Sequence, residues 1–219
     1  MRSPSGSAPT AERVAFYDHR ILPELIGCAC RTRALTRQRA RLIPLAEGRV
    51  LELGMGAGAN LPFYDPRRVS ELRGLEPSEP LRAKAAAVAR PAGLRLRLDD
   101  GRAEALPYPP ASFDTVVSTF TLCSVPDPAA ALREARRVLK SSGRLLFCEH
   151  GLAPDRRTAR WQHRLEPAWA AMAGGGRLTR DVGAELDPAG FVAGRMERRY
   201  LRKVPRLVGW TTTGEARPV

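Results

Sequence analysis

The sequence is poor in aromatic residues, histidine and cysteine, and it has no long apolar run. Aromatic residues make up 6% of the 219 residues, and there are three histidines and four cysteines. No stretch approaches about 18 uninterrupted apolar residues, so the sequence predicts no membrane-spanning helix. The opening stretch MRSPSGSAPT lacks the apolar core of a secretory signal, so we expect no such signal and predict that residues 1–9 form a disordered leader.

The cysteines form no recognisable metal or redox motif. Cys28, Cys30, Cys123 and Cys148 are spaced neither as a zinc ribbon nor as a CxxC pair. Cys148 also lies in a run that is typical of a buried strand. The pattern fits ordinary thiols in a reducing compartment, so we predict no metal site and a cytoplasmic location.

Acidic residues are too few to balance the basic ones. Thirty-six Lys and Arg face 23 Asp and Glu, which gives a net charge of +13, and nearly all the basic residues are Arg. This excess fits a nucleic acid, an anionic membrane or an acidic substrate as a partner. It also fits a compositional bias, because the chain is rich in Ala, Arg, Gly and Pro and its arginines are spread along the whole length. We favour the compositional explanation and expect no specific nucleic-acid binding.

The chain has no internal repeat and no long linker, which favours one structural unit over residues 47–219. Short apolar strands alternate there with longer helices, which indicates βαβ units and a mostly parallel sheet. The predicted strands and helices are Arg49–Leu53, Glu71–Leu75, Ser78–Arg90, Leu94–Leu98, Phe113–Phe120, Pro128–Leu139 and Arg144–Cys148. Phe191–Leu201 and Arg206–Gly214 are expected to close the sheet as an antiparallel pair. Residues 10–46 are predicted to form two helices, because Pro23 interrupts their apolar spacing.

A glycine-rich loop follows the first predicted strand, in the segment E-L-G-M-G-A-G (52–58). Glycines there allow a tight turn and let a ligand lie against the main chain. Gly54, Gly56 and Ala59 also satisfy the dinucleotide pattern GxGxxA, so a nicotinamide or flavin cofactor is an alternative. Glu52 lies just before the loop, where a carboxylate repels a pyrophosphate but attracts the ammonium and sulfonium of S-adenosylmethionine. Glu52 therefore favours the second ligand.

A second carboxylate, Glu76, ends the second predicted strand, 18 residues after Gly58. At this place it can accept hydrogen bonds from both ribose hydroxyls of either cofactor. Glu76 therefore supports an adenosine ligand without choosing between the two.

The chain resembles the class I S-adenosylmethionine-dependent methyltransferases in five segments between Gly48 and Phe147. In order and spacing these segments are E-L-G-M-G-A-G, L-E-P-S, G-R-A-E-A-L-P-Y, S-F-D-T-V-V and R-V-L-K-S-S-G-R-L-L-F. The resemblance implies an α/β fold with a Rossmann-like, seven-stranded, mostly parallel sheet and helices on both faces. It also implies N-terminal lid helices in residues 10–46, S-adenosylmethionine as the cofactor and methyl transfer as the reaction.

A narrower resemblance covers nearly the whole chain. It is carried by F-Y-D-H-R-I-L-P-E-L-I, G-A-N-L-P-F-Y, T-L-C-S-V-P-D-P, C-E-H-G and W-Q-H-R-L-E-P-A-W. These segments are similar to the methyltransferase-like thiol S-methyltransferases and their bacterial relatives. Ubiquinone/menaquinone-biosynthesis C-methyltransferases and phospholipid N-methyltransferases are more distantly similar. The resemblance implies a small-molecule acceptor, which is a thiol or a lipid-like or quinone compound.

The resemblance also implies which residues contact S-adenosylmethionine. The predicted contacts, from the methionine part through the ribose and adenine to the sulfonium, are Glu52, Gly54, Gly56, Gly58, Glu76, Pro77, Ala103, Glu104, Thr119 and Phe120. Many class I enzymes have Asp where this chain has Arg102, which cannot accept a hydrogen bond from the adenine amino group. Asp99 and Asp100 are the candidates to replace that acceptor.

Methyl transfer from a sulfonium is an in-line displacement, so catalysis should depend mainly on proximity and orientation. His150 follows the fifth strand, at the end of the sheet where open α/β folds place their sites, and is the candidate catalytic residue as a base or an acceptor-orienting group. Glu149 either orients its imidazole or faces the other way. Tyr17 and Trp169 are candidates to wall an apolar acceptor pocket. Structural roles for these side chains are the alternative.

Two further interpretations remain open. The Arg-rich residues 10–46 suit peripheral contact with an anionic membrane. A non-catalytic S-adenosylmethionine-binding or RNA-binding protein is the alternative function. However, no N-P-P-Y-type motif follows the fourth strand and no RNA-binding module is visible, which favours an enzyme with a small-molecule acceptor.

Overall fold

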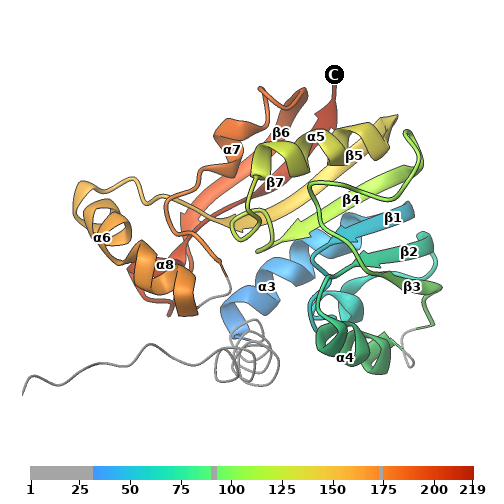
Figure 1. The fold of residues 1–219 in the computed structure, drawn as a ribbon, viewed down its shortest axis with the longest axis horizontal. Coiled ribbons are helices and arrows are strands. Elements are labelled where there is room, and N and C mark those ends of the chain that lie inside the picture. Colours follow the sequence, from blue (N-terminus) through green and yellow to red (C-terminus); the bar gives the residue numbers. More distant parts are fainter. Residues whose placement is uncertain (1–31, 90–92, 173–174) are drawn as a thin grey trace, which may run out of the picture.

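The chain folds around one seven-stranded sheet in a computed structural model that describes residues 32–89, 93–172 and 175–219 (Figure 1). The strands are β1 (Gly48–Leu53), β2 (Val69–Leu75), β3 (Leu96–Asp99), β4 (Phe113–Thr119), β5 (Leu139–His150), β6 (Phe191–Tyr200) and β7 (Trp210–Pro218). Their order in the sheet is β3-β2-β1-β4-β5-β7-β6. The strands β1 to β5 pair in parallel, and β7 runs antiparallel between β5 and β6. The predicted mostly parallel sheet is confirmed.

Helices cover both faces of this sheet. The described helices are α3 (Arg33–Leu42), α4 (Glu79–Ala89), α5 (Pro128–Val138), α6 (Arg156–Met172), α7 (Val182–Glu185) and α8 (Arg206–Gly209), with 3-10 turns at Ile43–Leu45 and Leu61–Phe63. None of them is long and apolar enough to cross a membrane. The helix α5 begins where the Asp127 side chain accepts a hydrogen bond from Ala130 N at 2.9 Å, with Pro128 in the first turn.

Two apolar cores lie on the two faces of the sheet. Neighbouring residues of a strand belong to opposite cores: Leu145 packs on one face and Leu146 on the other, as Val116 and Val117 do in β4. This alternation follows from the pleat, and it explains why the central strands are apolar along their whole length. Both cores are closed by helices, α5 on one side and α3 with α4 on the other.

The structure adds detail to several sequence predictions. The expected closing pair is present as β6 and β7, but Arg206–Gly209 is the short helix α8 and not the start of a strand. The strand β5 is longer than expected, at 12 residues. Of residues 10–46, which were predicted to form two helices, only α3 and the turn after it lie in the described part, and α3 packs on the sheet beside β5 and β7. Pro23 lies outside the described residues.

The sheet topology fixes the place of the site. The chain leaves β1 towards β2 on one side, and β4 lies on the other side of β1. In open α/β sheets a crevice forms at the carboxyl ends of the strands, where the strand order reverses. The glycine loop after β1 and the residues after β4 meet at this point.

Candidate active site

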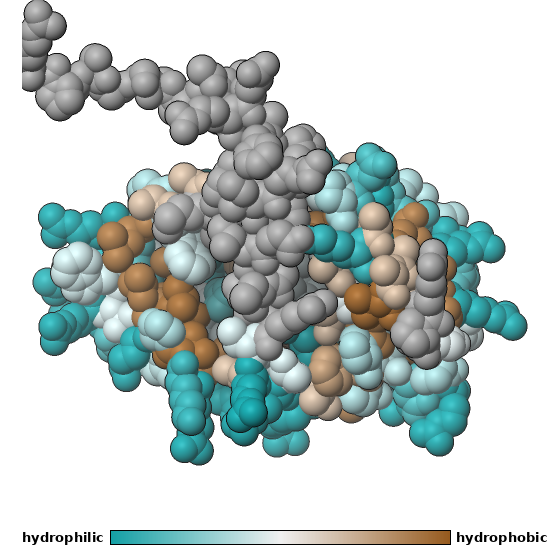
Figure 2. Space-filling view, turned by 90° about the horizontal axis from the view of Figure 1, so that it is seen from below, coloured by the Kyte–Doolittle hydropathy of each residue, from teal (hydrophilic) through white to brown (hydrophobic). Residues whose placement is uncertain are grey.

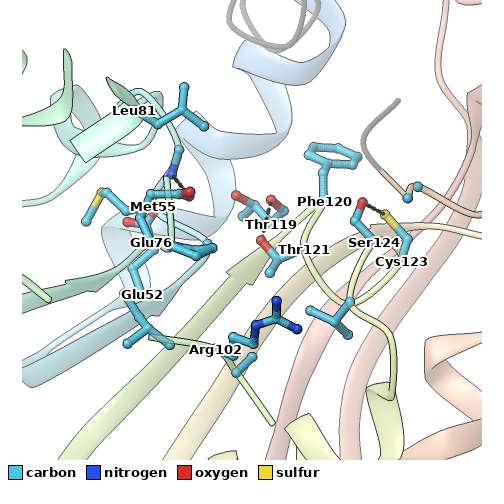
Figure 3. A pocket seen from close by; sticks show the side chains of 18 of the residues that line it. Glu52, Met55, Glu76, Leu81, Arg102, Thr119, Phe120, Thr121, Cys123 and Ser124 are labelled. Carbon is cyan, nitrogen blue, oxygen red and sulfur yellow. Dashed lines mark hydrogen bonds between the residues drawn. The ribbon is translucent and has the colours of Figure 1, made fainter. Parts of the chain in front are cut away.

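A cavity of about 590 Å³ opens at the carboxyl ends of β1, β2 and β4. Most of the predicted site residues line it, namely Glu52, Gly54, Gly56, Glu76, Pro77, Ala103, Glu104, Thr119, Phe120, His150 and Trp169. Figure 3 shows Glu52 and Glu76 on one side of the cavity and Cys123 and Ser124 on the other, with Thr119 between them. Tyr17 lies outside the described residues.

The glycine loop leaves room for a ligand at Gly56. Gly56 has a φ of +56°, and a Cβ built on it would meet nothing closer than the carbonyl oxygen of Gly54, at 4.0 Å. A side chain at this position would therefore project into open space in the cavity lining. Gly54, with a φ of +62°, is glycine for a different reason, because a Cβ there would collide with the side chain of Thr121.

Gly58 is not among the residues that line the cavity, and its predicted contact with the methionine part of the cofactor stays a prediction. Its φ is +77°, and a Cβ would lie 2.6 Å from Leu61 Cδ1 and 3.2 Å from Ala85 Cα. Glycine is required at this position because the loop packs directly against α4. The loop pattern in the sequence could not separate this packing requirement from ligand contact.

Glu76 holds the glycine loop while keeping acceptor capacity for a ligand. Its side chain is buried, with Oε2 accepting from Gly56 N and Oε1 accepting from Ser78 N, both at 2.9 Å. Each carboxylate oxygen has a second lone pair, so two hydroxyl donors can still be bound. Burial raises the pKa of Glu76, an unfavourable desolvation that two additional donors would offset. The residues present therefore fit a ribose.

Glu52 is a buried carboxylate, and no cationic side chain of the described residues is directly bonded to it. Its Oε1 accepts from Asn60 Nδ2 at 2.8 Å and its Oε2 accepts from the Tyr64 hydroxyl at 2.7 Å. Burial raises the pKa of Glu52 to about 7, although these hydrogen bonds and the charge of Arg39 act in the opposite direction. A cationic ligand in the cavity would stabilise the ionised form, so the site fits the ammonium of S-adenosylmethionine.

Arg39 and Asn60 complete this network, and neither was predicted from the sequence. Arg39 Nε donates to Asn60 Oδ1 at 2.9 Å, and Asn60 Nδ2 donates to Glu52 and to Thr119 Oγ1, the latter at 2.9 Å. Arg39 also lies over the ring of Phe120, with 5.6 Å between its guanidinium carbon and the ring centroid. The segment G-A-N-L-P-F-Y contained a signal for Asn60, but nothing in the sequence distinguished Arg39 from the other arginines around it.

Arg102 lies in the cavity lining next to Ala103 and Glu104, which are predicted to contact the adenine. Arg102 lines the cavity, as Figure 3 shows, whereas Asp99 and Asp100 do not. Asp99 Oδ2 accepts from the Tyr108 hydroxyl at 2.8 Å, and Asp100 pairs with Arg82 at 3.3 Å. Both aspartates are thus bonded to side chains outside the cavity lining, and the suggestion that one of them replaces the missing acceptor stays a prediction.

His150 and Glu149 face opposite sides of β5, as neighbours in a strand do. Glu149 accepts from Ser118 Oγ at 2.7 Å and from the backbone N–H groups of Thr121 and Cys123, both at 3.1 Å. It therefore holds the turn after β4 and does not orient the imidazole. His150 lies beside the ring of Phe120, with centroids 4.6 Å apart, and its buried Nδ1 has no hydrogen-bond partner among the described residues.

The protonation state of His150 follows from its surroundings. Burial lowers the pKa of His150 to about 4, so its imidazole is neutral at physiological pH. Phe120 adopts a φ of +58°, which is uncommon for a residue with a side chain and often marks a functional site. The neutral imidazole can exchange a hydrogen bond with an acceptor molecule, but it is a weak base.

The far side of the cavity is built by two backbone segments that hold each other. The first is the turn Cys123–Pro126, and the second is Gly175–Arg177, which follows α6. Arg177 N donates to Cys123 O at 2.8 Å, and Arg180 reaches Leu122 O at 2.8 Å. Trp169 of α6 completes this wall. Burial raises the pKa of the Cys123 thiol well above its usual value, so this thiol is neutral.

An open parallel sheet with a glycine loop and a carboxylate at its switch point defines a nucleoside-binding α/β protein. A family model described as a methyltransferase domain matches residues 51–147. Human thiol S-methyltransferase TMT1B is 37% identical over 183 residues, which are 75% of this chain and 71% of the relative. The phosphatidylethanolamine N-methyltransferase of Cereibacter sphaeroides is 34% identical over 118 residues, or 52% of this chain and 56% of that protein.

Solved structures agree on the fold. The [4+2]-cyclase SpnF superposes with a TM-score of 0.68 over 99% of both chains, at 23% identity. A Bacillus halodurans protein described as a putative methyltransferase has a TM-score of 0.67 at 18% identity, over 85% of this chain and 98% of its own. Since one of these neighbours is titled a cyclase, the fold alone does not fix the reaction. The sequence relatives do: the chain belongs to the class I S-adenosylmethionine-dependent methyltransferases, in the family that includes the thiol S-methyltransferases.

Proposed function

We propose that this methyltransferase transfers the methyl group of S-adenosylmethionine to the sulfur of a small apolar thiol. The observation that carries the proposal is the neutral His150, whose pKa is lowered to about 4. Among the described residues on the acceptor side of the cavity, none is a base that titrates near neutral pH. A thiol has a pKa of about 8.5 and ionises without help, whereas a hydroxyl or a carbon acid needs a strong base. The thiol S-methyltransferase relatives support the same acceptor.

The residues of the site have separable tasks in this reaction. Glu52 would hold the ammonium of the cofactor and Glu76 its ribose, and the bound cofactor would supply an electrophilic methyl group from its sulfonium. Phe120, Val125 and Trp169 exclude water from the acceptor, which strengthens the attack of a thiolate by removing its hydration. The thiolate sulfur forms a bond to the methyl carbon as the methyl–sulfonium bond breaks, and the thiol proton goes to solvent. The chain contributes proximity and orientation more than acid–base chemistry.

We also propose that the protein acts in the cytoplasm and contacts anionic membranes peripherally. The net charge of +13 supports this contact. In the described part of residues 10–46, Arg33, Arg37 and Arg41 lie exposed along α3, and Arg41 is paired with Glu197. A lipid-like thiol would concentrate at such a surface.

The proposal is tested by a radiolabelled methyl-transfer screen. Each acceptor thiol is compared with the alcohol of the same carbon skeleton, and quinols, phospholipid vesicles and RNA are assayed in parallel. We expect transfer to the thiols only, and none with the Glu76→Ala variant at limiting cofactor. The homocysteine product should raise the melting temperature, whereas NAD should not. Transfer to the alcohol, the quinol, the lipid or the RNA at a rate equal to the thiol would exclude the thiol proposal.

A further inference from the structure

The helix α6 exposes an apolar stripe to solvent. Trp161 is 49% exposed and Leu165 is 38% exposed, and Ala168 continues the stripe at helical spacing. The other side of α6 is engaged with the protein. Gln162 is buried and bonds Ala153 N at 2.8 Å, and Glu166 accepts from Thr179 N at 2.9 Å. The outward stripe is therefore not part of the core, although it lies on a well-anchored helix.

A row of arginines runs beside this stripe. Arg157, Arg160 and Arg164 are exposed, and none of them forms an ion pair among the described residues. Arg164 lies over the ring of Trp161, with 5.8 Å between its guanidinium carbon and the ring centroid. The carboxylate on α6, Glu166, faces inward. The outer face of α6 is consequently basic and apolar, with no acidic residue on it.

Elsewhere on the described surface, some exposed arginines have acidic partners, whereas others, such as Arg95, Arg97 and Arg133, form no ion pair. Arg67 pairs with Asp65 at 2.9 Å and Arg68 pairs with Glu47 at 2.6 Å. The side of the molecule that carries α6 and α8, at the left of Figures 1 and 2, shows hydrophobic surface beside long hydrophilic side chains. A general arginine bias accounts for the number of arginines and for those that are unpaired, but not for the row on α6 that lies beside the exposed side chains of Trp161 and Leu165.

We propose that α6 docks on an anionic lipid surface. Interfacial helices combine a basic flank with Trp and Leu, because the ring and the aliphatic chain enter the headgroup region while arginine binds lipid phosphates. A nucleic acid offers phosphates but no apolar layer for Leu165. A second copy of α6 would bring two rows of arginines together, which like-charge repulsion disfavours. An anionic bilayer offers both phosphates for the arginine row and an apolar layer for Trp161 and Leu165.

This docking surface lies next to the cavity. Trp169 on the inner side of α6 lines the cavity, and so does Gly175–Arg177 directly after the helix. The helix α6 therefore lies between a membrane bound on its outer side and the acceptor side of the site, and an apolar acceptor dissolved in lipid would enter the cavity past this helix. This entry route depends on the proposed thiol methyl transfer, whereas lipid binding by α6 does not.

The test is vesicle flotation of the full chain with phosphatidylcholine vesicles, with and without phosphatidylglycerol. One variant combines Arg157→Glu, Arg160→Glu and Arg164→Glu. The control combines Arg95→Glu, Arg97→Glu and Arg133→Glu, which changes the net charge equally at exposed arginines outside α6. We expect the wild type and the control to bind the anionic vesicles and the α6 variant to bind at least about tenfold more weakly. Equal weakening of both variants, or equal binding to both kinds of vesicle, would overturn the proposal.

Fluorescence tests the insertion of the stripe without changing the charge. Brominated lipids should quench the tryptophan fluorescence of the wild type. Trp161→Phe should still bind the vesicles but lose much of this quenching, and any quenching that remains would come from Trp169 and Trp210. Unchanged quenching would overturn the proposal, as would a concentration-dependent dimer that protects Trp161 or a displacement of vesicles by RNA. Circular dichroism verifies that each variant is folded.

An assay without vesicles tests the proposed thiol methyl transfer separately from lipid binding by α6. The α6 variants should methylate a water-soluble thiol at the wild-type rate and lose rate only when the thiol is carried in anionic vesicles. Equal rates of all variants on the vesicle-borne thiol would remove the entry route. If even the wild type methylates no thiol, the proposed function fails, and the flotation result still decides whether α6 binds lipid.

Discussion

Arg39 donates from Nε to Oδ1 of Asn60 at 2.9 Å, across 21 residues of sequence, and so joins α3 to the loop after β1. Both side chains are buried. The bond fixes the Asn60 amide with its NH2 group towards Glu52 and Thr119, which uses both of its donors. The helix α3 is thereby connected to the cofactor side of the cavity through a continuous chain of hydrogen bonds.

Replacing Arg39 by Met should weaken cofactor binding. Without Arg39 the Asn60 amide loses its orienting donor, and Glu52 loses a positive charge that lowers its pKa. We expect the affinity for S-adenosylhomocysteine to fall about tenfold, as for the loss of one charge-assisted hydrogen bond. Isothermal titration calorimetry measures this, with Arg37→Met on the exposed side of α3 as the control. An effect as large in the control would show that only net charge matters.

Cofactor affinity should depend on pH through Glu52. In the ligand-free protein the pKa of Glu52 is about 7, so the carboxyl group is increasingly protonated below that pH. A cationic ligand binds the ionised form, so affinity should fall up to about tenfold per unit as pH decreases below 7 and should level off above it. Glu52→Gln should bind weakly with no such inflection. An inflection that persists in Glu52→Gln would assign it to another group.

Glu52 should also make the stability of the ligand-free protein depend on pH, in the direction opposite to that of cofactor affinity. The folded-state pKa of Glu52, about 7, lies above the ordinary glutamate pKa of 4.5, so the folded state binds the proton more tightly than the unfolded state. The ligand-free protein should therefore lose stability from this group as pH rises from 4.5 towards 7. Glu52→Gln should reduce this loss, by up to about 3 kcal/mol. Denaturant unfolding on both sides of this pH window measures the difference, and equal pH slopes would contradict it.

Glu76→Ala should reduce cofactor affinity on the order of a hundredfold while the fold persists. Hydrogen bonds to a charged acceptor contribute about 1.5–3 kcal/mol each, and each 1.4 kcal/mol is about tenfold in affinity. The carboxylate also holds Gly56 N, so the loop loses an anchor in the same variant. Glu79→Ala, at an exposed position three residues later, is the charge-matched control. Calorimetry measures the affinity, and circular dichroism verifies the fold. A folded Glu76→Ala variant with wild-type affinity would show that Glu76 does not contact the ribose.

The two glycines Gly56 and Gly58 should respond differently to alanine. Gly56→Ala places a methyl group in the open cavity, so cofactor binding should be lost with only about 1–2 kcal/mol of strain from its positive φ. Gly58→Ala pushes into Leu61 and Ala85, so it should additionally lose about 1–3 kcal/mol through overpacking. Thermal unfolding without ligand separates the two variants. Equal destabilisation would contradict the assignment of Gly58 to packing.

His150 should influence acceptor binding more than the chemical step. With a thiol acceptor the rate should rise with pH until the thiol ionises, with no separate step near the ordinary histidine pKa of 6.5. His150→Gln should raise the acceptor KM and change kcat less than about tenfold. General bases typically contribute 10²–10⁴-fold, so a loss of that size in kcat would show that His150 takes the proton.

The fold and the cofactor loop were predictable because their signals are local. Strand-length apolar runs, helices between them and the glycines after β1 lie within short segments, and Glu76 follows from the end of the next strand. The opposite orientation of Glu149 and His150 also follows from the pleat once the strand is known. These features are set by the chain itself and by the few ways in which parallel strands connect.

Tertiary packing decided the rest of the site. The sequence alone could not show that Gly58 packs against Ala85 or that Asp99 accepts a hydrogen bond from Tyr108. It also could not show which of the many arginines is bonded to Asn60, namely Arg39. Each of these contacts joins residues that are distant in sequence and depends on how a helix or loop lies on the sheet. Burial then set the chemistry, because the same desolvation raises the pKa of Glu52 and lowers that of His150. The sequence specifies the residue types, but their protonation states depend on the packed environment.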